Sequence, residues 1–219
     1  MKKYLIISGL LITISCSGQS NLSKRTVYSH FINDNIKEYD SMFNKRTDLI
    51  LLTTIDKFES VIDSLYLFDF LSGNIENNEF YQKTFIGQEP TLYFDMPPTY
   101  GLGKMLKHDT ELGQLMLKLF SNYKQDLSAI SDIDTNYNIK VIKKAKPYFK
   151  MGWTKFHKKH KDCYGIIRFS NIIFNDSYDR AMFYVENYKG SLDASGDIVV
   201  MRKINDKWTI EYYINQWMS

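Results

Sequence analysis

The C-terminal third of the chain holds four segments rich in aromatic and β-branched residues, separated by short polar turns. Such a series predicts consecutive hairpins, which assemble as an antiparallel meander. Helical patterns come earlier in the chain, and helices that precede a block of strands are typical of the α+β class. We therefore expect N-terminal helices packed on a C-terminal antiparallel meander sheet. The four segments are Tyr164–Phe174, Arg180–Tyr188, Asp197–Ile204 and Trp208–Trp217.

Apolar side chains in the N-terminal half recur at the three- and four-residue spacing of amphipathic helices. Asp109 precedes one of these patterns and is expected to cap the helix, because its carboxylate can accept backbone amides of the first turn. Two short β-branched runs predict strands instead. The predicted helices cover residues 25–43, 56–70 and 109–123, with a short helix around Trp153 and Phe156, and the predicted strands cover residues 48–55 and 138–142.

The first sixteen residues have the layout of an export signal. Lys2 and Lys3 precede an apolar run over residues 4–14, which ends at the small residue Ser15 and then Cys16. This run is too short to cross a bilayer, which takes about 20 apolar residues as a helix. The layout resembles a bacterial lipoprotein signal, which implies cleavage after Ser15 and a lipid on Cys16. We expect an envelope protein anchored to the outer membrane and facing the periplasm.

The chain then divides into a signal (residues 1–15), a lipidated cysteine with a polar tether (16–24) and a single α+β domain (25–219). Of the 28 basic and 25 acidic residues, Lys2 and Lys3 belong to the signal, so the mature chain has a formal charge of +1. A near-neutral domain lacks the broad basic surface that nucleic acid requires. The partners we expect are the membrane, through Cys16, and another envelope protein.

Residues 150–219 contain a series of short motifs, namely G-W-x-x-F at 152–156, F-S-N-I-I-F-N at 169–175, A-M-F-Y-V at 181–185, G-D-I-V-V at 196–200, K-W at 207–208 and a terminal W-M-S. The series resembles a group of exported bacterial lipoproteins of uncharacterised activity, and this resemblance implies no catalytic residues. The final Trp-turn-strand pattern is similar to NTF2-like domains, which implies a cone-shaped fold and a small-ligand cavity as an alternative.

Polar and aromatic side chains alternate along two of the predicted strands. If both sets lie on one side of the meander, they form an aromatic surface with acidic groups, suited to a sugar, a peptide or a partner protein. The alternative is that N-terminal helices cover these residues, which then form the rim of the core. The two sets are Tyr184, Glu186 and Tyr188 on one strand, and Glu211, Tyr213 and Trp217 on the other.

One stretch of the sequence gathers residue types that can bind metals or act in catalysis. His157 and His160 share a helix face, and Asp162 and Cys163 follow. Zinc accepts all these ligand types, but four lysines crowd the same turns and disfavour a cation. We expect no metal, no cofactor and no disulfide, with Cys163 buried. The favoured hypothesis is a non-catalytic binding or accessory protein, and the alternative is an envelope hydrolase around His157, His160 and Asp162.

Overall fold

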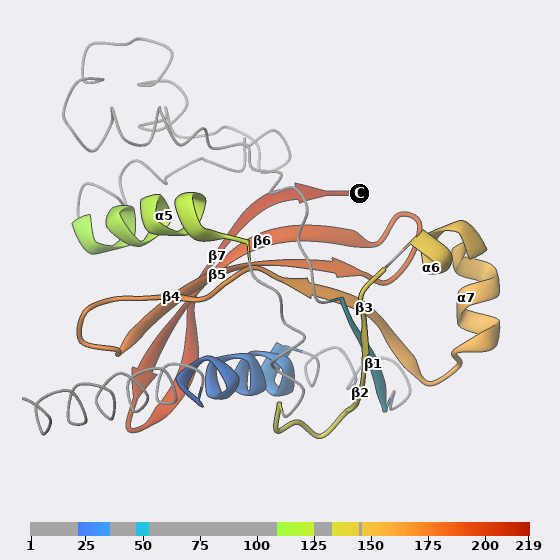
Figure 1. Cartoon of the computed structure of the whole chain (residues 1–219), viewed down its shortest axis with the longest axis horizontal. Helices are drawn as coiled ribbons and strands as arrows, with labels where there is room; N and C mark the ends of the chain where they lie inside the picture. The colour runs from blue at the N-terminus through green and yellow to red at the C-terminus, as the bar shows by residue number, and fades with distance from the viewer. Residues whose placement is uncertain (1–21, 36–46, 53–108, 125–132, 145) are drawn as a thin grey trace, which may run out of the picture.

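The computed structural model describes residues 22–35, 47–52, 109–124, 133–144 and 146–219 (Figure 1). Within these residues the protein is an α+β structure with one seven-stranded open sheet, which confirms the predicted class. The strands are β1 Asp48–Leu52, β2 Asn138–Ile142, β3 Cys163–Phe169, β4 Ile173–Phe174, β5 Arg180–Tyr188, β6 Ala194–Ile204 and β7 Lys207–Met218. The helices are residues 22–35, α5 Thr110–Asn122, α6 Lys146–Met151 and α7 Trp153–Lys159.

The sheet has the strand order β2-β1-β3-β5-β6-β7, and the short β4 pairs with β5. Pairing is antiparallel from β3 through β7, as hairpin connections require. The two earlier strands extend this meander by parallel pairing, with β1 lying between β2 and β3. The sheet is therefore mixed. The sequence runs predicted both early strands, but nothing in them indicated that they would join the same sheet.

Helices cover both faces of the sheet. Figure 1 shows α5 on one side of the strands and the helix over residues 22–35 on the other. Buried side chains under the N-terminal helix come from both the helix and the sheet, and include Phe31, Phe169 and Phe183. Those under α5 include Leu115, Met182 and others from β5, β6 and β7. An open sheet with a helix on each face follows the α+β expectation rather than the cone-shaped alternative.

A third apolar cluster lies where α6 and α7 cover β1 and β3. Phe156 of α7 is buried there against side chains that include Ile50, Cys163 and Ile166. Cys163 is buried, as predicted, and its thiol donates to the carbonyl oxygen of Gly165 at 3.4 Å. Burial in an apolar cluster with an internal hydrogen bond is the ordinary environment of a structural cysteine.

Several predictions lie partly or wholly outside the described residues. These include the signal, Cys16 and the helix predicted over 56–70. They also include residues 36–43 of the helix predicted over 25–43 and residues 53–55 of the strand predicted over 48–55. The helix predicted over 109–123 is α5, and Asp109 caps it by accepting a hydrogen bond from the Leu112 amide at 3.0 Å. The single strand predicted over Tyr164–Phe174 is instead two strands, β3 and β4, with residues 170–172 outside both. None of the helices in the described part of the chain is long and apolar enough to cross a membrane.

Arg180, at the start of β5, forms an ionic cluster that attaches α5 to the sheet. Its side chain is 1 % exposed and contacts Asp109 at 2.6 Å, Glu211 of β7 at 2.9 Å and Glu111 at 3.3 Å. The hydrogen bond from Arg180 holds the pKa of Asp109 below its usual value. Since Asp109 also caps α5, one buried guanidinium fixes the first turn of that helix against two strands.

We expect Arg180→Met to lower the free energy of unfolding by about 2–3 kcal/mol, because it removes the charged hydrogen bonds that hold three partly exposed carboxylates. Arg202 is the matched control: it contacts the same Glu211 at 3.0 Å, but its side chain is 44 % exposed. Arg202→Met should therefore cost no more than about 1 kcal/mol. Urea unfolding of both variants measures the difference, and equal losses would contradict the role given to Arg180.

Candidate functional site

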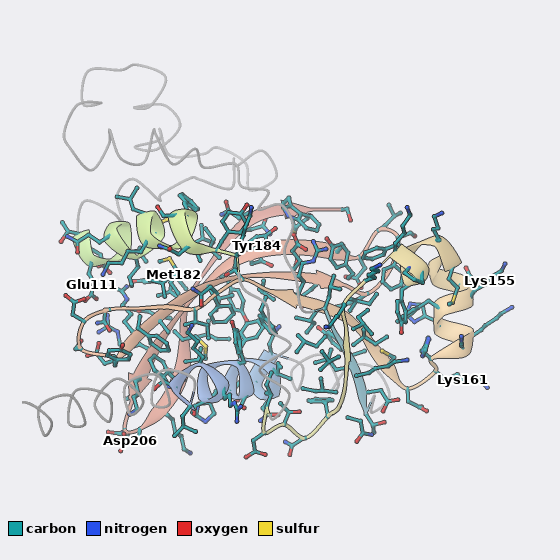
Figure 2. The ribbon with its side chains drawn as sticks, viewed as in Figure 1. Glu111, Lys155, Lys161, Met182, Tyr184 and Asp206 are labelled. Carbon is teal, nitrogen blue, oxygen red and sulfur yellow. The ribbon has the colours of Figure 1, made fainter. Side chains whose placement is uncertain are left out.

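Four neighbouring strands bring their side chains together on the face that also carries α5, α6 and α7. Arg168 of β3 is paired with Glu186 of β5, Glu186 with Gly196 of β6, and Gly196 with Trp217 of β7. Tyr184 and Tyr188 flank Glu186 on the same face of β5, because side chains alternate along a strand. Figure 2 shows Tyr184 in the sheet between α5 and the α6–α7 pair.

Hydrogen bonds join these side chains into what we call the Glu186 cluster, made of Arg168, Tyr184, Glu186, Tyr188 and Trp217. One carboxylate oxygen of Glu186 accepts from the Arg168 guanidinium at 2.9 Å and from the Tyr188 hydroxyl at 3.1 Å. The other accepts from the Tyr184 hydroxyl at 3.2 Å. The Trp217 indole N–H donates to the Tyr184 hydroxyl oxygen at 2.7 Å. The cluster therefore links β3, β5 and β7 across β6.

Gly196 allows this link across β6. A Cβ atom at this position would collide with the indole nitrogen of Trp217 and with the hydroxyl of Tyr184. The absence of a side chain lets the Trp217 ring lie over β6 and reach Tyr184 on the next strand. A glycine inside a strand often marks such a close approach.

Burial dominates the electrostatics of the cluster. Glu186 is 3 % exposed, and desolvation raises the pKa of its carboxyl above the usual value, although Arg168 and the two tyrosine hydroxyls act in the opposite direction. Burial, together with the adjacent Glu186, also raises the pKa of Tyr184. Tyr184 and Glu186 thus lie beneath the surface, and their polar atoms hold neighbouring side chains in place.

The part of this region that reaches the surface is a row of four aromatic rings, which we call the aromatic rim: Trp217, Tyr188, Phe149 and Trp153. The Tyr188 ring lies 5.9 Å from Trp217 and 5.0 Å from Phe149, and Phe149 lies 6.3 Å from Trp153, between ring centroids. Phe149 is exposed, and the other three rings are partly buried. Phe149 and Trp153 come from α6 and α7, and no sequence pattern predicted that they would meet β5.

The structure brings together four of the six side chains predicted as a binding surface: Tyr184, Glu186, Tyr188 and Trp217. It separates the other two. Glu211 belongs to the Arg180 cluster, and Tyr213 lies on the opposite face, with its ring 6.5 Å from Phe31 of the N-terminal helix. For Tyr213 the reason is the register shift between β6 and β7 at Gly196/Asp197, which places one extra residue between Trp217 and Tyr213. Each extra residue reverses the face on which the following side chains lie.

The two histidines of the metal-type residues around α7 both lie against the ring of Phe156 but differ in their other contacts. The His157 Nε2 lies 2.8 Å from the Lys189 carbonyl oxygen, whereas His160 also lies against the ring of Tyr148. Burial, with the nearby positive charges of Lys140 and Lys159, lowers the pKa of His160. Among the described residues no group of three or more His, Cys, Asp or Glu side chains is arranged to hold a metal ion.

No protein-family model matches the chain, and comparison with curated proteins and with solved structures finds no significant similarity.

Proposed function

We propose that this protein is a lipid-anchored component of the bacterial cell envelope that acts by binding a partner protein at the aromatic rim. The N-terminal layout of two lysines, a short apolar run, Ser15 and Cys16 supports export and lipidation. The Glu186 cluster carries the proposal of binding, because it fixes two of the four rings of the rim: Tyr188 donates to the buried Glu186 carboxylate, and Trp217 donates to the Tyr184 hydroxyl.

A buried carboxylate is costly unless charged and polar partners satisfy it. Glu186 has three such partners, and through them it determines where Tyr188 and Trp217 lie. Rings that are fixed before binding lose little conformational entropy on association, so more of the contact energy is retained as affinity. The buried Glu186 carboxylate beneath the partly exposed aromatic rim therefore supports the interpretation of the rim as a preorganised recognition surface.

Aromatic side chains with a polar atom at one end are enriched at the centres of protein interfaces, where Trp and Tyr contribute most of the binding energy. The aromatic rim has two such side chains, Tyr188 and Trp217, next to the exposed ring of Phe149. A protein partner in the envelope fits this composition best. The hydrolase alternative requires His157, His160 and Asp162 to act in one place, whereas the His157 Nε2 is already engaged by the Lys189 carbonyl oxygen.

Replacing Cys16 tests the anchor. We expect Cys16→Ala to move the protein from the detergent phase to the aqueous phase, because the modified cysteine is the proposed attachment to the bilayer. Phase partition of cells expressing each form, with mass spectrometry of the N-terminal peptide, measures this. A matched Ser17→Ala variant should stay in the detergent phase. Unchanged partition of the Cys16 variant would contradict lipidation as the means of attachment.

A photoreactive phenylalanine analogue tests the binding surface. Phe149 is 40 % exposed within the aromatic rim, and Tyr213 is 49 % exposed on the opposite face of the sheet. The two side chains are therefore similarly exposed to solvent but lie on different faces. We expect irradiation of cells to give one discrete crosslinked product from position 149 and none from position 213. Equal products from both positions, or none from position 149, would contradict binding at the rim.

A further inference from the structure

The formal charge of this chain is strongly segregated. Between Lys140 and Lys161 there are nine lysines and no aspartate or glutamate. The other residues of the proposed mature chain hold 17 basic and 25 acidic residues, a formal charge of −8. The near-neutral total thus conceals one basic segment in an otherwise acidic protein.

The fold gathers this segment at one end of the molecule. It forms β2, α6 and α7, and all nine lysines are exposed. Figure 2 shows Lys155 on the outer side of α7, away from the sheet, and Lys161 just past the end of that helix. We call this region the basic end; its lysines are Lys140, Lys143, Lys144, Lys146, Lys150, Lys155, Lys158, Lys159 and Lys161.

Little negative charge opposes the basic end. None of its lysines forms an ion pair within the described residues, whereas Lys118 and Lys203 elsewhere do pair with carboxylates. The nearest acidic residues along the chain and the sheet are Asp162, which follows the segment, and Asp48, which pairs with the first residue of β2. Unpaired lysines at this density produce a positive potential that attracts an anionic partner.

Exposed apolar side chains interrupt the lysines. Val141 lies next to Lys140, and Phe149 lies next to Lys150, and both are among the exposed large hydrophobic residues of the structure. Lysines with interspersed aromatic and aliphatic side chains are typical of segments that lie at a membrane surface, where the charges meet anionic headgroups and the apolar groups enter the interface. We propose that the basic end binds the surface of an anionic lipid bilayer.

The position of the basic end suits a second attachment to the membrane. In Figure 1 the helix over residues 22–35 begins well away from α6 and α7 along the long axis. The tether from Cys16 to that helix has about six residues and can span only about 20 Å. Under the proposed function, which supplies the anchor, lipid holds one end of the domain near the bilayer and the lysines hold the other. The aromatic rim begins at Phe149, so its partner would also lie at the membrane.

Vesicle binding by the proposed mature chain, beginning at residue 16 and carrying Cys16→Ala, tests the basic end without the lipid or the signal. The test variant changes Lys155, Lys158, Lys159 and Lys161 to Gln. The control changes Lys118, Lys124, Lys203 and Lys207 to Gln, which removes the same charge from exposed positions elsewhere. Each protein is sedimented with vesicles of phosphatidylcholine alone or mixed equally with phosphatidylglycerol, and circular dichroism checks that each is folded.

We expect binding to the anionic vesicles that weakens with salt, and a loss of about 100-fold or more in the test variant but much less in the control. Equal losses in the two variants, or equal binding to phosphatidylcholine alone, would overturn the proposal. Tighter binding to duplex DNA than to anionic vesicles at the same ionic strength would also overturn it, in favour of a nucleic-acid partner. None of these outcomes bears on the lipid anchor or on the aromatic rim, because every variant in this experiment lacks the lipid and keeps Phe149.

Discussion

The structure depends on burying β5 on both of its faces. Every residue of this strand except the last is buried, so any charged side chain on it must find partners inside the protein. Arg180 near its start and Glu186 near its end each do so, and each thereby fixes other elements. Arg180 holds the first turn of α5, and Glu186 holds Tyr188, Tyr184 and, through it, Trp217. The stable framework and the candidate recognition surface therefore follow from one constraint.

Local sequence signals predicted the elements well. The segment Arg180–Tyr188 is a strand with the predicted bounds, and α5 agrees with its predicted range to within one residue at each end. Alternation, helical spacing and the Asp109 cap all depend on neighbours within a few residues, which is why they can be read from the chain. The open α+β arrangement follows from the order of helices and strands.

The features that assemble the site depend on residues far apart in sequence. The parallel addition of β1 and β2 gives no local signal. The register shift at Gly196/Asp197 puts Tyr213 and Trp217 on opposite faces, although simple alternation places them on one face. Phe149 and Trp153 join the aromatic rim only because α6 and α7 pack on β3 and β1. The basic end, by contrast, is visible as a run of lysines, but its exposure and its place at one end are properties of the fold.

The central claim is that Glu186 is a buried support for the aromatic rim, and its titration tests this most directly. Nuclear magnetic resonance of the labelled carboxyl carbon, assigned with Glu186→Gln, follows the protonation of this one group. The account predicts a midpoint above the ordinary glutamate pKa of 4.5, because burial outweighs the hydrogen bonds from Arg168 and the tyrosines. A midpoint at or below 4.5 would contradict this, because the hydrogen bonds from Arg168 and the tyrosines would then outweigh burial in setting the Glu186 pKa.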